Sequence, residues 1–486
     1  MRFLLRWPVV LEKKTVARTG GLLLAGVATL LMTGTWRQAG SSPDTAPARV
    51  EPLPSTVPAK KASLDLDQRI AVGYPKLDAL YKYLHHFPEL SLREAHTAAR
   101  LAQELEGTGF VVTRNFGGFG LVAVLRNGPG PTVLVRTEMD ALPVEEKTGL
   151  PYASKMRTLD RRGNDVAVMH ACGHDVHMTC WVGTARTLAA LRDRWHGTLL
   201  FIAQPAEEIG TGADLMLEAG LFRRFPRPDY CLALHCDAQQ PAGHVAFSRG
   251  MTMANVDTVD ITVRGKGGHG ALPHTTVDPI VLSARLILDL QTLVSRENDP
   301  GNPLVVTVGS IHGGSKHNII PSEVQLQLTI RTTTNSSRKH ALDGIARMAR
   351  AAAAGAGAPE PILNLHPGGF TPALINDSVL TEKTVAVFRD VLGADRVHER
   401  APVMLGEDFA VYGRQGVPIF LYFLGTQPPE RVAEAERQGQ PLPSLHSDHF
   451  YPIPEPTIKT GVLTMSRAVL NLLGKETPKP LAVTGS

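Results

Sequence analysis

Outside its first residues, the sequence carries almost no excess of charge. The formal net charge is +4, and the five basic residues and one glutamate of residues 1–18 account for all of it. The neutral remainder gives no electrostatic reason to expect nucleic-acid binding. The chain has 486 residues and 43% hydrophobic content. That length is too great for one hydrophobic core, so we expect two folded domains.

The apolar run near the N-terminus is short. It extends from Gly20 to Gly34, whereas a membrane-spanning helix needs about 20 apolar residues. Basic residues precede it and a Ser/Pro/Ala-rich stretch follows, as in export signals. No cysteine comes directly after the run, which argues against lipoprotein attachment. We predict a signal peptide over residues 1–40, a linker over 41–68 and export to a bacterial periplasm. The alternative is an N-terminal anchor retained in the inner membrane, the one case in which the chain contacts a membrane.

Cysteine is scarce and confined to one part of the chain. The four residues are Cys172, Cys180, Cys231 and Cys236. Cysteines of exported proteins commonly pair. If Cys172 binds metal, the other three can form one disulfide or none, and the sequence leaves this open.

Residues 169–177, M-H-A-C-G-H-D-V-H, hold one thiol, three imidazoles and a carboxylate. In a loop or an extended stretch, Cys172 and His174 can face one point, and Gly173 frees the backbone between them. The alternative is a helix start with incidental histidines.

The rest of the chain alternates between helix-like and strand-like segments. Helices are predicted over residues 74–86, 94–107 and 179–192, and strands over 120–126, 132–136 and 198–204. This order predicts an α/β fold with a mixed, largely parallel sheet flanked by helices and ligand groups at the strand ends.

Further metal-ligand candidates follow the predicted strands. Glu207 and Glu208 come directly after one strand, and adjacent side chains there point in opposite directions, so one can bind metal while the other faces water or substrate. A solvated surface pair is the alternative. His235 ends another apolar run, and His446 lies near the C-terminus. With Cys172 and His174, Glu208, His235 and His446 would make five ligands, enough for two divalent cations.

Several motifs resemble the amidohydrolase branch of the aminoacylase and carboxypeptidase G metallopeptidase superfamily, which includes hippurate and auxin-conjugate hydrolases. The matching segments are L-H-H-F-P-E-L-S over residues 84–91 with Glu94, R-T-E-M-D-A-L-P over 136–143, M-H-A-C-G-H-D over 169–175, Q-P-A-E-E over 204–208, G-K-G-G-H-G-A-L-P-H over 265–274 with Asp278 and Pro279, N-I-I-P over 318–321, G-E-D-F-A over 406–410 and L-H-S over 445–447. They occur in the expected order over residues 75–470.

The resemblance implies a site with two divalent metal ions. Its ligands would be Cys172, His174, Glu208, His235 and His446, and Glu207 would be the general base. The thiolate favours zinc, with manganese, nickel and cobalt as alternatives. The metals would activate a water and polarise the scissile carbonyl, and Glu207 would move a proton from that water to the departing amine.

The resemblance also implies a zinc-peptidase-like catalytic domain with an inserted α+β dimerisation domain and therefore a homodimer. We place the insertion at 253–366, the catalytic domain at 69–252 and 367–475, and a flexible tail at 476–486. A strand, helix, strand, strand, helix pattern over 256–264, 279–293, 304–310, 324–331 and 338–354 supports the insertion independently. The family pattern assigns His269 to oxyanion stabilisation in a neighbouring subunit's site. It assigns Asn318 and Arg331 to the substrate's polar or carboxylate end.

One position departs from the family pattern. Glu138 stands where an aspartate usually supports a ligand histidine, so metal preference or rate could differ from that of relatives. For His170, His177, His274 and His449 we favour structural or supporting roles. The predicted function is hydrolysis of N-acyl amino acids or similar small amides. The alternatives are a dipeptidase or carboxypeptidase using the same site, and a catalytically silent binding protein.

Overall fold

The computed structural model describes residues 59–474, with side chains described from Leu66 onward except at 366–368. The predicted signal peptide, most of the predicted linker and the predicted tail lie outside these residues. Within the described part, no helix has both the length and the apolar character needed to cross a membrane.

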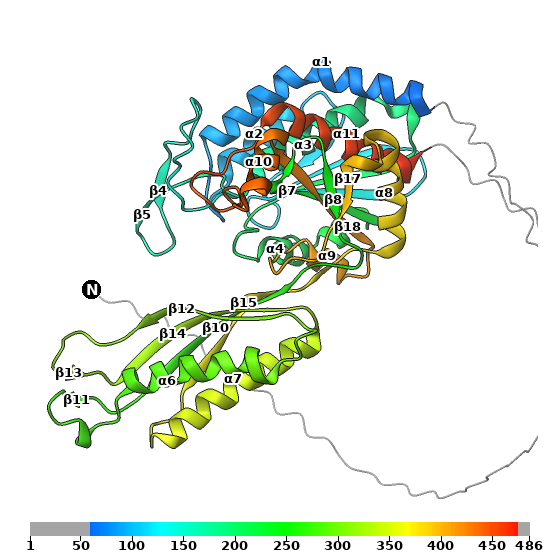
Figure 1. Ribbon diagram of the computed structural model, residues 1–486. Helices are drawn as coiled ribbons and strands as arrows, with labels where there is room; N and C mark the ends of the chain where they lie inside the picture. Colours follow the sequence, from blue (N-terminus) through cyan, green and yellow to red (C-terminus); the bar gives the residue numbers. More distant parts are fainter. Residues whose placement is uncertain (1–58, 475–486) are drawn as a thin grey trace, which may run out of the picture. The chain divides into compact units, whose positions relative to one another are not determined.

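A mixed eight-stranded sheet forms the larger core (Figure 1). In spatial order its strands are β1 (Val111–Thr113), β2 (Leu121–Asn127), β6 (Gly197–Gln204), β3 (Thr132–Glu138), β7 (Tyr230–Pro241), β18 (Ile419–Gln427), β8 (Val245–Phe247) and β17 (Val397–Glu399). The central neighbours β6, β3, β7 and β18 are parallel, whereas β1, β2 and the β18–β8 pair are antiparallel. Every residue of β3 and β18 is buried, as expected for strands covered on both faces.

Helices cover both faces of this sheet. One face carries α1 (Ala59–His86), α2 (Ala95–Glu104), α3 (His174–Ala190), α8 (Ser378–Leu392) and α11 (Pro454–Leu473). The other carries α4 (Gly212–Glu218), α5 (Leu221–Arg224) and α9 (Ala410–Gly413). Alternate side chains of β3 divide between the two cores, because Val133 and Val135 pack on one face and Leu134 on the other. The α/β fold with a mostly parallel sheet is therefore confirmed.

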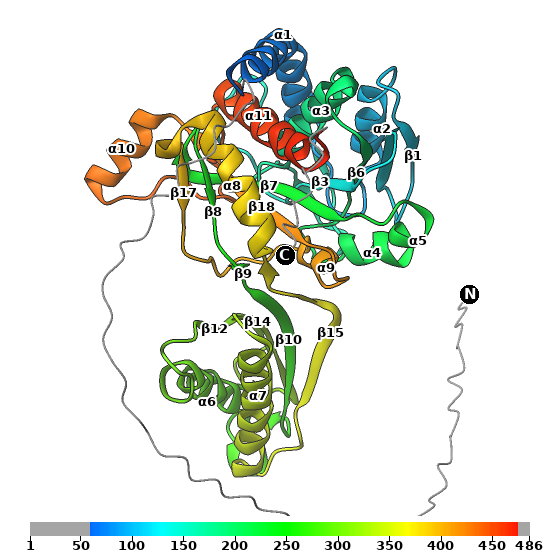
Figure 2. The ribbon, with the colours of Figure 1, turned by 90° about the vertical axis from the view of Figure 1, so that its right-hand side faces the viewer.

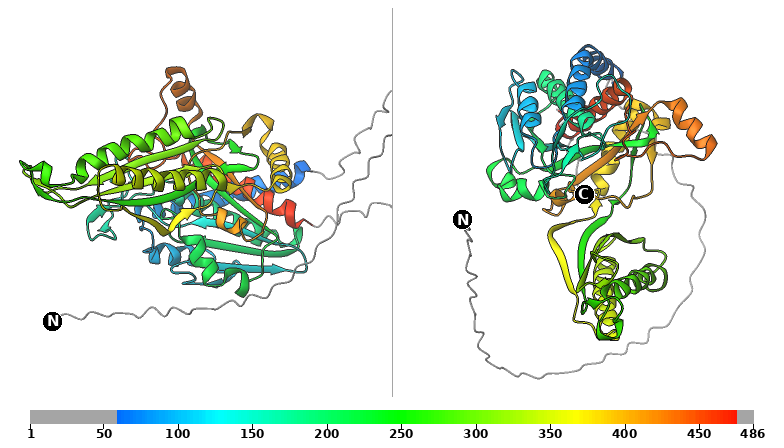
Figure 3. Two further views of the ribbon diagram at one scale, coloured as in Figure 1. Left: turned by 90° about the horizontal axis from the view of Figure 1, so that it is seen from below. Right: turned by 90° about the vertical axis from the view of Figure 1, so that its left-hand side faces the viewer.

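A second, antiparallel sheet has a hydrophobic core of its own. Its strands in spatial order are β12 (Leu304–His312), β14 (Glu323–Thr332), β10 (Asn255–Arg264) and β15 (Ile362–Thr371). Helices α6 (Pro279–Thr292) and α7 (Asn335–Gly355) lie side by side on one face (Figures 2 and 3). Burial alternates along β10, so one face meets the helices. Asp278 caps α6 by accepting from the N–H of Ile280, and Thr334 caps α7 in the same way.

Smaller elements complete the described chain. They are the strand pairs β4 (Arg157–Leu159) with β5 (Asp165–Ala167), β9 (Met251–Met253) with β16 (Leu374–Ile375), and β11 (Gly268–His269) with β13 (Ile319–Ile320), the helix α10 (Pro429–Gln438), and the short helical turns η1 (Arg192–Arg194), η2 (Pro273–Thr275), η3 (Leu293–Glu297) and η4 (Ala394–Arg396).

Three boundaries differ from those predicted. Helix α1 begins at Ala59, so residues 59–68 are helical where a linker was predicted; Leu66, Ile70 and Leu77 are buried at helical spacing on both sides of Pro75. Helix α3 begins at His174, not at Thr179. Strand β15 was missed, and the predicted domain end at 366 lies inside it. Its Pro and Gly residues are typical of loops, but β15 is an edge strand, where proline is tolerated.

Candidate active site

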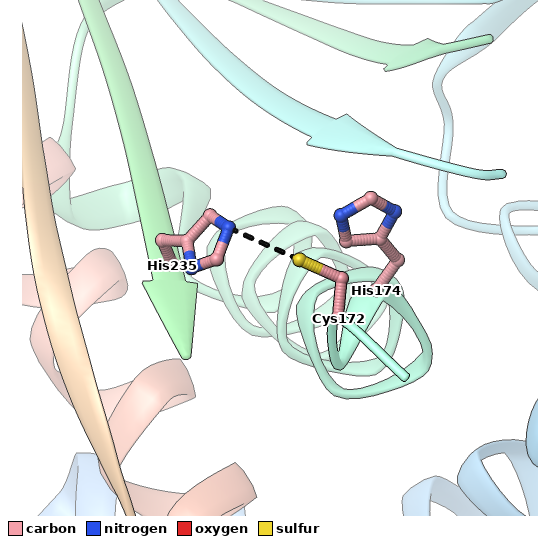
Figure 4. A group of neighbouring side chains, drawn as sticks. All are labelled: Cys172, His174 and His235. Carbon is pink, nitrogen blue, oxygen red and sulfur yellow. Dashed lines mark hydrogen bonds between the residues drawn. The ribbon is translucent and has the colours of Figure 1, made fainter. Parts of the chain in front are cut away.

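Five side chains from distant parts of the chain converge near the C-terminal ends of β3 and β6. Several three-residue groups here can hold a metal ion, and two of them together contain all five predicted ligands: Cys172, His174 and His235 form one, and Cys172, Glu208 and His446 form the other. The Sγ of Cys172 lies 3.6 Å from His235 Nε2 and 3.3 Å from His446 Nε2. Figure 4 shows this thiol between His174 and His235. Cys172 belongs to both groups, so its thiolate would be available to an ion held by either group.

Unusual backbone conformations bring these residues together. Gly173 has a φ of 82°, and a Cβ there would lie 2.9 Å from the Sγ of Cys236, so glycine is required between the first two ligands. His174 then begins α3 and His235 lies within β7. Ala206 and His446 also have positive φ values, 57° and 68°.

The free atoms at the centre fit divalent cations. His174 Nδ1 bonds the carbonyl of Asp140 at 2.7 Å and His235 Nδ1 bonds that of Cys236 at 2.9 Å, which leaves both Nε2 lone pairs facing the centre. His174 Nε2 and Glu208 Oε1 are buried without a hydrogen-bond partner in the described chain. Buried polar atoms are seldom left unpaired, and a thiol, imidazoles and a carboxylate are the donors that transition metals prefer.

Asp140 holds the turn that carries Glu207 and Glu208, a role that the sequence did not predict. Its Oδ1 and Oδ2 accept from the N–H groups of Glu207 and Glu208 at 3.1 and 3.0 Å. The hydroxyl of Ser91 donates to Oδ2 at 2.6 Å. Asp140 therefore orients the predicted base and one ligand through side-chain contacts, and His174 through its carbonyl.

A buried charge network behind the site was also not predicted. The Arg136 guanidinium lies 2.8 Å from Glu407 Oε1, 2.8 Å from Asp408 Oδ1 and 3.0 Å from Glu138 Oε2. The Nε2 of Gln204 donates to both oxygens of Asp408 at 2.7 and 2.8 Å. The motif segments 136–143, 204–208 and 406–410 contained these residues, but nothing in the sequence showed that the three segments meet.

The surrounding carboxylates give the centre a negative electrostatic potential. Burial first, and then Glu407 and Glu208, hold the pKa of Glu207 well above its ordinary value. Burial and Asp140 raise the pKa of Glu208 in the same way. Burial likewise raises the pKa of the Cys172 thiol, with Glu208 adding to the effect. Positive charge at this point would stabilise the anionic form of all three groups, as divalent cations do.

Glu138 supports a histidine other than the predicted ligands. Its Oε1 lies 2.8 Å from His177 Nδ1 and 3.9 Å from His174 Nε2. The Nε2 of His177 accepts from the N–H of Cys236 at 2.7 Å, so both ring nitrogens are engaged. His170 is buried, whereas His274 and His449 are exposed. All four cysteines are free thiols, so the possible disulfide does not form in this structure.

A cavity of about 650 Å³ opens onto the metal-ligand residues. Arg331 lines it and is half-buried, and its guanidinium has no hydrogen bond or ion pair with another described residue, whereas Arg400 in the same wall pairs with Asp237. Burial lowers the pKa of Arg331 from its usual value. An unpaired, half-buried guanidinium can bind a carboxylate. Apolar side chains form other parts of the wall, among them Met253, Val256, Val403, Leu405 and Phe423.

Two predicted residues do not reach this cavity within one chain. His269 on β11 and Asn318 next to β13 are exposed and are absent from the cavity lining. The N–H of Gly270 bonds the carbonyl of Asn318 at 2.8 Å, so the two residues lie close to each other.

The fold and the paired ligand groups define a metal-dependent hydrolase. Residues 134–438 match the model of Peptidase family M20/M25/M40, and the chain belongs to this family. It is 34% identical to the thermostable carboxypeptidase 1 of Saccharolobus solfataricus over 78% of this chain and 91% of that one. It is 35% identical to an N-acetyl-L-cysteine deacetylase of Bacillus subtilis over 72% and 80% of the two chains.

A solved structure extends the comparison to the metals. A dinuclear metal binding peptidase from Bacillus subtilis, of the same family, superimposes with a TM-score of 0.66 and 27% identity over 83% of this chain and 99% of that one. Family and site together support two divalent ions. The predicted family resemblance is confirmed, and an enzyme is supported over a catalytically silent binding protein.

Proposed function

We propose that the protein is an amidohydrolase that cleaves the amide bond of N-acyl amino acids or similar small conjugates. The observation that carries this proposal is the position of Glu207, which lines the cavity beside two ligand groups that share Cys172. Its Oε2 is 3.9 Å from His174 Nε2, so its carboxylate borders the ligand centre.

Five residues would hold the metals. Cys172, His174 and His235 would bind one ion and Cys172, Glu208 and His446 the other, with zinc favoured by the thiolate and manganese, nickel or cobalt as alternatives. When bound, the ions supply Lewis acidity toward a water and the scissile carbonyl. Glu207 accepts the water proton and donates it to the departing amine. Asp140 keeps Glu207 in place because its side chain accepts a hydrogen bond from the backbone N–H of Glu207.

The cavity indicates which substrates fit. Arg331 would bind a single carboxylate, because Asp237 neutralises the other arginine of the wall. The apolar wall would accept an apolar acyl group or side chain. A carboxypeptidase or dipeptidase activity at the same site is the second candidate, favoured by the similarity to a carboxypeptidase.

The test is hydrolysis of a panel of acyl amino acids and dipeptides by protein reconstituted with each candidate metal. We expect turnover of acyl amino acids, and we expect Glu207→Gln to lose at least about 10³-fold in kcat while binding as much metal as the wild type. Activity on dipeptides alone would favour the second candidate. Metal-free, inactive wild-type protein would contradict both.

We further propose a homodimer in which His269 and Asn318 complete the partner's site, since neither reaches the cavity of its own chain. This assigns dimerisation to an inserted domain built on the antiparallel sheet. Export to the periplasm, with the inner-membrane anchor as the alternative, stays a prediction that cell fractionation can test.

A further inference from the structure

The turn that carries Glu207 has a backbone conformation that alanine seldom adopts. The φ of Ala206 is 57°, in the left-handed region. Its N–H donates to Glu94 Oε1 at 2.9 Å, and the next two N–H groups donate to Asp140 at 3.1 and 3.0 Å. Three successive amides are therefore bonded to carboxylates outside the turn. Such conformations persist only where surrounding contacts hold them.

Glu94 accepts a hydrogen bond from Ala206 instead of capping helix α2, which its position in the chain would favour. It is the residue immediately before α2, where a side chain usually caps the helix, yet it makes no capping hydrogen bond. Its Oε1 accepts from Leu92 and Ala206, both at 2.9 Å, and its Oε2 has no partner among the described residues. The side chain is fully buried and forms no ion pair within the described chain. Burial of an unpaired carboxylate is unfavourable, so stabilisation of α2 alone does not account for it.

We propose that Glu94 is a positioning residue: it fixes the backbone of Ala206 and through it the location of the Glu207 carboxylate. The segment that carries Glu94 also supplies Ser91, whose hydroxyl donates to Asp140 at 2.6 Å. One stretch of four residues, 91–94, thus supplies one of the two carboxylates that hold the turn and contacts the other. The effect on catalysis rests on the proposed role of Glu207 as the base.

The informative variants are Glu94→Met, which fills the space without an acceptor, and Glu94→Gln, which keeps an oxygen for the two N–H groups. A displacement of about 1 Å at a reacting group can lower the rate about 10²-fold. We therefore expect Glu94→Met to lose about 10²-fold in kcat, with KM changed less than about threefold and metal content unchanged. Glu94→Gln should stay within about threefold of the wild type in both constants.

Two further variants separate positioning from general destabilisation. Asp377→Ala removes a cap from α8, where Oδ1 of Asp377 accepts from the N–H of Leu380 at 2.8 Å, far from the turn in sequence and contacts. It should lower thermal stability and leave kcat unchanged. Ala206→Gly provides a residue that adopts the positive φ without help, so Glu94→Met/Ala206→Gly should recover part of the kcat lost by Glu94→Met.

Amide hydrogen exchange of residues 206–212 gives a readout independent of catalysis. We expect faster exchange in metal-loaded Glu94→Met and wild-type exchange in Glu94→Gln. Unchanged exchange in Glu94→Met would overturn the inference, as would unchanged kcat in an active protein. If Glu94→Met does not fold, recovery of folding by the double variant supports the inference and continued failure overturns it. If the wild type hydrolyses no substrate of the panel, the proposed function is contradicted. The exchange experiment then still shows whether Glu94 fixes the backbone of the turn.

Discussion

At the scale of single residues, His85 is a buried imidazole that lies between two carboxylates outside the metal-ligand cluster. Its Nδ1 lies 2.7 Å from Asp175 Oδ2 and its Nε2 lies 3.0 Å from Glu146 Oε1, and the rings of Tyr81 and Tyr152 pack against it. Burial lowers the pKa of His85, but the hydrogen bonds to Asp175 and Glu146 outweigh it and raise the pKa to about 9. The imidazolium is thus the folded-state form at neutral pH.

This raised pKa predicts a pH-dependent stability. In the unfolded chain the pKa of His85 is near its ordinary value of 6.5, so its contribution to stability is full below pH 6.5 and is lost as pH rises through 9. The contribution is on the order of 3 kcal/mol. Urea unfolding of wild type and His85→Gln at pH 6 and pH 9.5 should give a stability difference that shrinks at the higher pH. A difference independent of pH would show that folding does not shift the pKa of His85.

Glu138 gives a second prediction at this scale. Its carboxylate reaches His177 Nδ1 at 2.8 Å and Arg136 Nη1 at 3.0 Å together. Aspartate is shorter by one methylene, so Glu138→Asp should lose one of these contacts. It should also move negative charge away from the ligand His174, whose Nε2 lies 3.9 Å from Glu138 Oε1, and so weaken metal binding about tenfold. Competition with a chromophoric chelator measures this, and Glu138→Gln tests the charge at constant length. Unchanged affinity and rate in Glu138→Asp would make this glutamate a neutral replacement for the family's aspartate.

At the scale of elements, helices α3 and α11 approach closely because both carry small residues. A Cβ at Gly461 would lie 2.4 Å from the Sγ of Cys180 and 3.0 Å from Leu424 Cδ2. Gly461→Ala should therefore destabilise the fold by about 1–3 kcal/mol, although alanine favours helix formation. Adding Cys180→Ala should relieve most of that loss, as measured by urea unfolding. If the two effects simply add, the helices adjust and the close contact is unimportant.

The elements also show what sequence can predict. Buried strands such as β3 and β6, and the five residues that form the two ligand groups, were predicted because apolar runs and motif spacing are local signals. Strand β15 was missed because its Pro and Gly residues are typical of loops and because its pairing partner β10 lies about 100 residues earlier. The contact between Arg136 and Glu407 was missed for the same reason, since it joins residues 271 positions apart. Motifs identified these residues, but only the fold shows that they meet.

At the scale of the whole molecule, the exposed apolar residues of α6 support the proposed dimer. Val281 and Leu288 are 57% and 69% exposed, and Ile311 on the neighbouring edge strand β12 is 49% exposed. Apolar side chains grouped in this way mark protein interfaces, and an edge strand offers unpaired backbone groups for pairing with another chain. If a second copy binds here, each site could receive His269 from the other subunit.

Mixing two inactive variants tests this exchange. His269→Ala keeps its own Glu207, and Glu207→Gln keeps a His269 that it could lend. When equal amounts are unfolded together and refolded, half of the dimers should be mixed, and each mixed dimer has one complete site, so roughly a quarter of wild-type activity should return. Glu207→Gln refolded with Glu207→Gln/His269→Ala should stay inactive, since neither chain then carries the base. Adding Leu288→Lys to both partners should prevent the recovery by separating the subunits. If His269 serves its own chain, the mixture stays as inactive as its parents, and the proposal that subunits share their sites is wrong.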